Sequence, residues 1–376
     1  MNDAPVLPDA VRRRRLRAQR LDDDVGAHDA DAGAHDAGVP GIVRAVGGIQ
    51  AQDMHAAMLG VVVRGRAAGA SAIAAELAVA RERDRTIVRT WCMRGTMHLV
   101  PADLLANLLT VFAPVHIRRG RRRLAALGLD ERACVRGVHL IADVLAGQAL
   151  RTRGEIAAAV RERGLPLDLR GQAPIHLVRR ACLEGVACEA GSRDRQPVYG
   201  LRSEWFPGPP AAARDHALDD LARWYLTAFG PASRDDFAAW SGLPAGDVRQ
   251  AWDHLDGLIE VHPGLWVRGP DPGAPAAPDR VTARLAPAFD GYLLGYRGRA
   301  HAVAPAHREL VHPGGGIVRP TVLIDGRVAG TWRIERTRLV ITMFAGAPGV
   351  PVGALDAEVA RVGAALDADL HLAMVG

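Results

Sequence analysis

The sequence predicts an α+β fold in which three helix–turn–helix segments, each closed by a short β-hairpin, precede a separate β-unit. Two observations carry this prediction. Three stretches share one order of helical periodicity, turn, helical periodicity and short alternating strands. After a Pro/Gly/Ala-rich linker, the apolar period changes to the strict alternation of β-strands. The expected domains are residues 1–105, 106–207, 208–268, the linker 269–280, and 281–376.

The first segment opens with a basic helix at residues 9–20 and continues into a low-complexity run at 26–38. The side chains of that run that resemble metal ligands are His28, Asp29, His35 and Asp36. Nothing in the sequence orders them, so we expect a solvated loop and no metal. A helix at 71–85 and two strands around Arg94-Gly95 complete the segment, which is the least regular of the three.

The middle segment shows the pattern most clearly. Thr152 is a suitable N-cap for a helix at 154–164, and a turn leads to a second helix at 173–185. Residues 186–201 then read as a hairpin. This order is that of a helix-turn-helix followed by a wing.

The third segment repeats the order. Ser233 caps one helix, Pro244 opens the next, and residues 258–269 form a hairpin around Pro263-Gly264. In the last segment, alternating strands at 319–344 turn at Asp325-Gly326 and near Arg336-Thr337, and an amphipathic helix follows at 355–370.

Charge points to a polyanionic partner. The net charge is +5, and all 47 basic residues are arginine. Winged helices in series are typical of nucleic-acid binding, although such units also mediate protein contacts and one copy in an array often serves only as scaffold. With no lysine, Schiff-base chemistry on a lysine amine is excluded, so a base-excising enzyme would stop at an abasic site; the N-terminal amine remains a formal alternative.

No apolar run is long enough for a membrane helix, and no secretory signal is visible. The four cysteines form no CxxC pair, which favours reduced thiols. We therefore expect a cytoplasmic, nucleoid-associated monomer with no membrane partner.

The segment Gln50-Ala51-Gln52 is the candidate for chemistry. Gly47-Gly48 breaks the preceding helical pattern, and Asp53 is a good N-cap for the next helix. Residues i and i+2 diverge by about 200° on a helix but point to the same side of an extended strand. Gln50 and Gln52 therefore share one cavity if the segment is extended.

Two glutamines suit a reaction whose leaving group is already good. They accept no proton at neutral pH, but they position a water and offer carbonyl oxygens to a developing cation. An N7-alkylated guanine is cationic and leaves as a neutral base, while the sugar becomes oxocarbenium-like. On the residues alone, the alternative that the glutamines only bond local backbone stays open.

Four motifs resemble the AlkZ-like winged-helix DNA glycosylases. They are GGIQAQDMHAAMLGVVVR (47–64), VRTWCMRGTMHLVPADL (88–104), LAPAFDGYLLGYRGR (285–299) and GGGIVRPTVLIDGRVAGTW (314–332). The resemblance implies three tandem winged helices and a C-terminal β-element forming a C-shaped channel for double-stranded DNA. It places the family's catalytic pair on Gln50 and Gln52, with no cofactor.

The resemblance also bears on substrate. Relatives that unhook interstrand crosslinks carry Gln-x-Asp, whereas this chain has glutamine at the second position. We therefore expect a monofunctional glycosylase for bulky N7-alkylguanine adducts, serving self-resistance to, or repair of, a DNA-alkylating natural product. A non-enzymatic winged-helix regulator or lesion-sequestering protein and a crosslink-unhooking glycosylase are the alternatives.

Three groups of residues are candidates for DNA contact. Alternation along the first hairpin predicts that Arg94, Thr96 and His98 share a face, with His98 either facing DNA or satisfying buried backbone. The second group is a cluster of arginines between residues 117 and 123, which is either a phosphate clamp or a solvated face. The third group flanks the C-terminal turns. The residues of these last two groups are Arg118, Arg119, Arg121, Arg122, Arg297, Arg299 and Arg319. Tyr292 and Tyr296 are expected in the core.

Overall fold

The structure is a computed structural model that describes residues 7–22, 38–65, 69–208, 210–269, 273, 275, 281–350 and 352–375. Most of the predicted linker lies outside these residues, as do the four side chains weighed as metal ligands, His28, Asp29, His35 and Asp36. Within the described residues, no helix combines the length and the apolarity needed to cross a membrane.

The chain forms two compact units, described here one at a time. The first unit comprises Met1–Leu77, Ala222–Ser241 and Trp252–Gly376, and the second comprises Ala78–Leu221 and Gly242–Ala251. The fold is mixed α and β, as predicted. The division into five consecutive segments stays a prediction.

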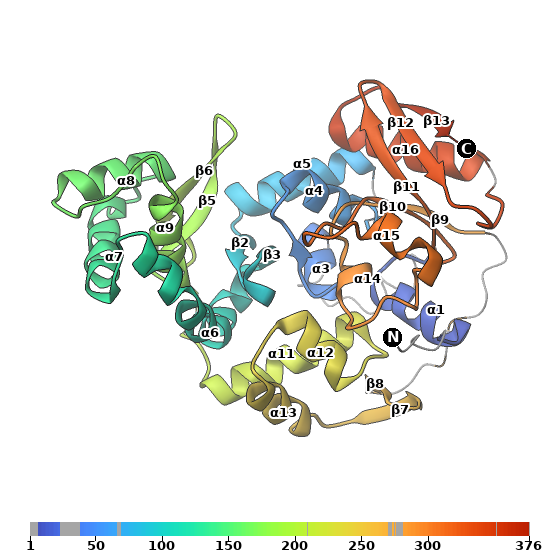
Figure 1. The fold of residues 1–376 in the computed structure, drawn as a ribbon, viewed down its shortest axis with the longest axis horizontal. Coiled ribbons are helices and arrows are strands. Elements are labelled where there is room, and N and C mark those ends of the chain that lie inside the picture. Colours follow the sequence, from blue (N-terminus) through green and yellow to red (C-terminus); the bar gives the residue numbers. More distant parts are fainter. Residues whose placement is uncertain are drawn as a thin grey trace. The chain divides into compact units, whose positions relative to one another are not determined.

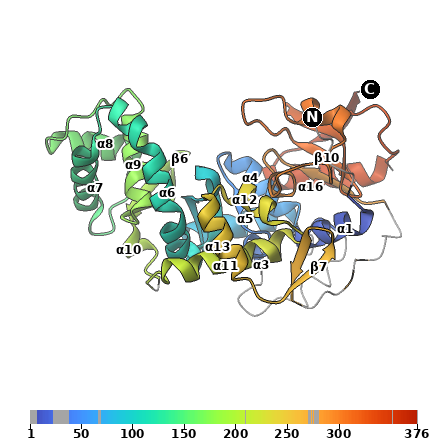
Figure 2. The same ribbon diagram turned by 60° about the horizontal axis from the view of Figure 1, so that its bottom comes forward.

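Figure 1 labels most of the helices of the described residues, and Figure 2 labels α10. They are α1 (Asp9–Ala18), α3 (Gly38–Ala45), α4 (Met54–Val62), α5 (Ala70–Glu82), α6 (Leu105–Ala126), α7 (Glu131–Leu145), α8 (Arg153–Glu162), α9 (Ala173–Leu183), α10 (Arg202–Trp205), α11 (Arg214–Phe229), α12 (Arg234–Ser241), α13 (Ala245–Asp253), α14 (Gly291–Leu294), α15 (Arg308–Val311) and α16 (Val352–Leu366), with 3-10 turns η1 (Met93–Gly95), η2 (Ala102–Leu104) and η3 (Pro305–His307).

The strands follow the same numbering. They are β1 (Ile49–Gln50), β2 (Ile87–Trp91), β3 (Met97–Pro101), β4 (Arg151–Thr152), β5 (Ala187–Arg193), β6 (Gln196–Leu201), β7 (Leu258–His262), β8 (Leu265–Arg268), β9 (Ala283–Ala286), β10 (Thr321–Ile324), β11 (Arg327–Glu335), β12 (Arg338–Met343) and β13 (His371–Val375).

The second unit is built around α7, α8 and α9, which pack on one another beside the β5–β6 hairpin (Figures 1 and 2). Thr152 begins α8 with a capping box, because its side chain accepts from the N–H of Glu155 while Glu155 accepts from the N–H of Thr152. Buried aliphatic side chains of all three helices fill the core. The helix, turn, helix and hairpin predicted for this stretch are confirmed.

The first unit contains a five-stranded sheet in the order β13-β12-β11-β10-β9. Its pairs are antiparallel except β12–β13, which is parallel. The predicted turn between β10 and β11 has Asp325 and Gly326 both at positive φ, 47° and 77°, as a two-residue type I′ hairpin requires. Helix α16 packs on this sheet and on α4.

The same unit also contains the β7–β8 hairpin and α12. The N–H of Asp236 donates to the hydroxyl of Ser233, which confirms the predicted cap of α12. Tyr292 and Tyr296 are buried, as expected, and donate their hydroxyls to the carbonyls of Gly326 and Phe229.

Candidate active site

The Gln50–Gln52 segment is extended, and its neighbours explain why. Gly47 and Gly48 both have left-handed φ values, 76° and 78°, which end α3 and redirect the chain. A Cβ at Gly47 would lie 2.6 Å from the ring of Phe229, so only glycine fits there. After the segment, Asp53 caps α4 by accepting from the N–H groups of His55 and Ala56 at 2.9 and 3.2 Å.

The side chains of Gln50 and Gln52 point to the same side. Nε2 of Gln50 donates to Oε1 of Gln52 at 2.6 Å, while Ala51 between them is fully buried. This orientation is the one that an extended segment predicts. Gln50 is half-buried and Gln52 is exposed. The two amides therefore lie at the surface, while the backbone between them is covered at buried Ala51.

Gln50 lines a small pocket within the first unit, with room for about one water molecule (about 10 Å³). Its walls come from the residue after α1, the chain from Val46 to Gln50, α4 with the residues directly after it, and the loop 287–291. Arg64 and Asp290 are among the lining residues.

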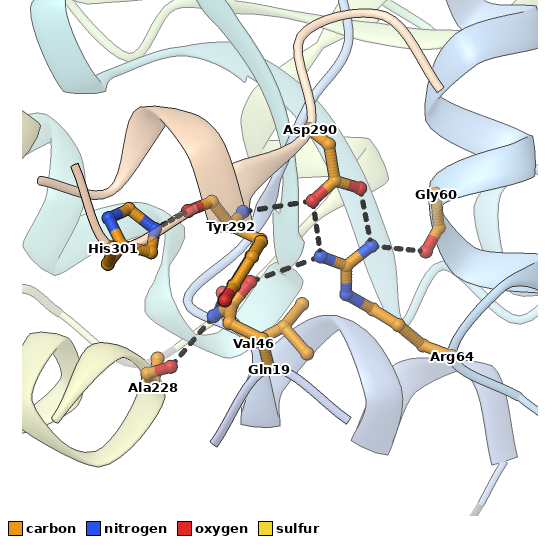
Figure 3. Close-up of polar contacts among 8 residues, drawn as sticks. All are labelled: Gln19, Val46, Gly60, Arg64, Ala228, Asp290, Tyr292 and His301. Atoms are coloured by element: carbon orange, nitrogen blue, oxygen red, sulfur yellow. Dashed lines mark hydrogen bonds and ion pairs between the residues drawn. The ribbon is translucent and has the colours of Figure 1, made fainter. Parts of the chain in front are cut away.

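Arg64 and Asp290 form a bidentate ion pair that is almost fully enclosed (Figure 3). Their side chains are 2% and 1% exposed, and both fork nitrogens of Arg64 lie 2.8 Å from a carboxylate oxygen. The same nitrogens donate to the carbonyl of Gly60 at 2.9 Å and to Oε1 of Gln19 at 3.1 Å. Sequence reasoning missed this pair because its members are 226 residues apart.

The first hairpin, in the second unit, differs in part from its prediction. Arg94 lies in the turn η1 with φ 54°, so strand alternation does not set its direction and does not place it on one face with Thr96 and His98. His98 is buried, with Nδ1 3.2 Å from the carbonyl of Thr96. Burial, aided by the charge of Arg94, lowers the pKa of His98 to about 3. This geometry matches the reading of His98 as a buried residue at a backbone carbonyl.

Two side chains that the sequence did not single out hold this turn. Nε2 of His116 lies 2.6 Å from the carbonyl of Cys92, and Arg179 donates to the carbonyl of Gly95 at 3.4 Å. The available signal was the position of His116 on α6, two residues before Arg118 of the basic cluster.

A family model described as DNA glycosylase AlkZ-like matches residues 43–368. The chain belongs to the AlkZ-like DNA glycosylase family. A curated relative from Streptomyces sahachiroi, described as an interstrand DNA cross-link repair glycosylase, is 27% identical over 340 residues, which cover 85% of this chain and 89% of the relative. The solved structure of Streptomyces sahachiroi DNA glycosylase AlkZ matches with a TM-score of 0.80 and 25% identity, covering 98% of this chain and 99% of that one.

The basic cluster of this glycosylase lies on α6, in the second unit. Arg118, Arg119, Arg121 and Arg122 are all exposed. Arg121 approaches Glu131 at 3.9 Å. Arg122 lies three residues after Arg119 and four after Arg118, so it shares a face of the helix with each of them. Contact with DNA stays a prediction for all four.

The C-terminal arginines of the glycosylase lie in the first unit and have unlike surroundings. Arg297 is exposed and forms an ion pair with Asp235. Arg299 is half-buried, and burial lowers its pKa. Arg319 is exposed and donates to the carbonyl of Leu310 at 3.1 Å. Their contact with DNA stays a prediction as well.

Proposed function

We propose that this glycosylase hydrolyses the N-glycosidic bond of N7-alkylguanine in duplex DNA, and that Gln50 and Gln52 are its catalytic residues. The observation that supports this most is the shared orientation of the two amides, joined at 2.6 Å, beside a pocket of water size. Membership of a DNA glycosylase family favours an enzyme over a non-enzymatic DNA binder.

The proposed chemistry uses the charge of the lesion. As the bond between N9 and the sugar C1′ breaks, its electron pair passes to the cationic base, which leaves neutral. The sugar becomes oxocarbenium-like, and the amide carbonyl dipoles stabilise that positive charge. A water held by the amides forms the new bond to C1′ and releases its proton to solvent, since a glutamine does not keep a proton at neutral pH.

The product should be an abasic site in an intact strand. No lysine is present to form a Schiff base with the opened sugar and cut the backbone. The proposed mechanism uses no metal, so EDTA should leave the rate unchanged.

We further propose that the helix–helix–hairpin stretches are winged helices that contact DNA. The best defined is α8, α9 and the β5–β6 hairpin, in the order that winged helices share. A bulky adduct that projects into a groove does not need the tight pocket into which other glycosylases flip a base.

Interstrand crosslink unhooking is the second candidate. It is favoured by the description of the relative from Streptomyces sahachiroi as a cross-link repair glycosylase. We nevertheless favour monoadducts, on the expectation from the sequence resemblance that a glutamine at position 52 goes with bulky monoadducts. Both substrates present the same cationic N7-alkylguanine to the two amides.

The test measures base release from a duplex with one N7-alkylguanine and, separately, from a duplex crosslinked through N7. The Gln50→Ala/Gln52→Ala double variant should lose on the order of 10²–10³ in single-turnover rate, comparable with removal of one strong transition-state dipole. Gln148→Ala, which changes an exposed glutamine before β4, is the matched control.

Three outcomes count against parts of the proposal. A double variant with the wild-type rate rejects the residue assignment. Tight binding of undamaged, sequence-specific DNA without base release supports the non-enzymatic alternative. Faster release from the crosslink than from the monoadduct favours the second candidate.

A further inference from the structure

The polar groups behind Gln50 form a continuous network of Gln19, Arg64 and Asp290, seen in Figure 3. Gln19 directly follows α1, Arg64 lies two residues after α4, and Asp290 is the N-cap of α14; all three line the pocket with Gln50. We propose that they are positioning residues that hold Gln50 in its working orientation. The inference rests on the proposed catalytic role of Gln50.

The network holds the chain before and after the glutamine segment. Nε2 of Gln19 donates to the carbonyl of Val46 at 3.2 Å, immediately before the Gly47–Gly48 turn that leads to Gln50. Arg64 donates to the carbonyl of Gly60 at 2.9 Å, in the helix that follows Gln52. Both ends of the glutamine segment are therefore tied to one buried group of side chains.

The network is also anchored from outside the segment. Gln19 donates a second bond, of 2.7 Å, to the carbonyl of Ala228, and Asp290 accepts from the N–H of Tyr292 at 2.9 Å. The carbonyl of Tyr292 in turn lies 2.9 Å from Nε2 of His301. These bonds fix the network to α11 and α14, so it acts as a rigid support.

The burial of the Arg64–Asp290 pair costs free energy. Two charges are taken out of water, and a buried ion pair is often no more stable than apolar side chains of the same volume. Nε of Arg64 is in addition buried without a hydrogen-bond partner in the described part of the chain. Stability alone therefore does not account for placing an ion pair here.

Asp290 also balances the charge beside the pocket. The oxocarbenium-like sugar is positive, and an unpaired arginine beside the same pocket would oppose it. Asp290 neutralises Arg64 through two bonds of 2.8 Å. Loss of the carboxylate should therefore slow the reaction even when the fold is retained.

The experiment is a double-mutant cycle on single-turnover base release from an N7-methylguanine duplex. Asp290→Asn should lower the rate about tenfold or more, as displacement of a catalytic group does, with the Kd for the duplex unchanged. In a Gln50→Ala background the same change should lower the rate less than about twofold, because the residue through which it acts is gone. Gln19→Met, which keeps both charges, should show the same dependence on Gln50 and carries the test if Asp290→Asn fails to fold.

The matched control is Glu358→Gln. Glu358 is a buried carboxylate of the same unit, 3% exposed, which accepts from the backbone N–H of Leu285. It should change stability and leave the rate of the folded protein at the wild-type value. Circular dichroism gives the folded fraction of each variant.

The outcomes separate the two proposals. A wild-type rate for Gln50→Ala rejects the proposed function and the inference with it. A loss in Asp290→Asn and Gln19→Met that is undiminished in the Gln50→Ala background overturns the positioning role and leaves the proposed function intact. A wild-type rate in both variants, or a loss that only follows the folded fraction, also overturns it.

Discussion

One arginine site in each compact unit shows opposite surroundings. In the first unit, Arg64 is buried and forms an ion pair with Asp290. In the second, Arg118, Arg119 and Arg122 lie on an exposed face of α6. An enclosed charge fixes geometry, whereas exposed arginines are available to neutralise phosphates in a salt-dependent manner. The comparison predicts that changes near Gln50 alter the rate and that changes on α6 alter affinity for DNA.

The largest effect expected in the second unit comes from removing the exposed face of α6. Arg118→Ala/Arg119→Ala/Arg122→Ala should weaken DNA binding on the order of 10–100-fold at moderate salt and reduce the salt dependence of log K by about 1 per arginine. The single-turnover rate at saturating enzyme should not change. Fluorescence anisotropy over a salt series measures the effect.

Arg83→Ala is the control for that variant. Arg83 is exposed and already paired with Asp84, so its loss should alter the salt dependence little. An α6 variant with wild-type affinity and salt dependence would show that the exposed face of α6 does not bind DNA and is only a solvated surface.

A second, smaller effect is the pH dependence of stability that a buried histidine gives to each unit. Burial lowers the pKa of His98, in the second unit, and of His301, in the first, to about 3. Both are neutral when folded, but the unfolded chain takes up a proton at its ordinary pKa of about 6.5. The free energy of unfolding should therefore fall as pH drops from about 6.5 toward 3, by about 1.4 kcal/mol per pH unit for each histidine.

Urea unfolding at several pH values measures this slope. His98→Asn and His301→Asn should each reduce it, and probes specific to one unit should show the reduction only in the unit that carries the change. A slope identical in the wild type and both variants would contradict the assignment.

The smallest predicted effect concerns the wall of the pocket. A Cβ at Gly60 would lie 3.3 Å from Cγ2 of Ile49 and 3.7 Å from Pro287, so Gly60→Ala should press on β1. We expect a rate about threefold to tenfold lower. The change in stability should stay within about 1 kcal/mol, since alanine also favours the helix.

Gly120→Ala provides the comparison for that change. Its Cβ would meet nothing within 4 Å, so only the helix preference of alanine remains and the rate should stay at the wild-type value. Equal rates in Gly60→Ala and Gly120→Ala would show that the pocket wall tolerates displacement.

Local chemistry made much of the fold predictable. The capping box at Thr152, the cap at Asp53 and the Asp325-Gly326 turn depend on residues within a few positions of one another. The extended form of the glutamine segment followed from the glycines and the cap on either side of it. Each of these features could be predicted because the residues that cause it lie next to it in the chain.

What the sequence did not predict depends on distant partners. Strand β13 forms by parallel pairing with β12, and the Arg64–Asp290 pair joins residues 226 positions apart. Helix α6 continues through Pro114, which a local reading takes as a break. Strand alternation likewise did not predict the left-handed φ of Arg94.

The bond between the two glutamine amides has a consequence for how the enzyme responds to its surroundings. Neither amide gains or loses a proton between about pH 5 and 9, so the proposed catalytic pair has no titration curve of its own. A glycosylase that relied on an aspartate carboxylate would instead lose activity as that group takes up a proton. Here the rate per bound lesion should stay level across this range for as long as the protein is folded. Gln52→Asp would introduce a titratable group and with it an acidic limb in the rate profile.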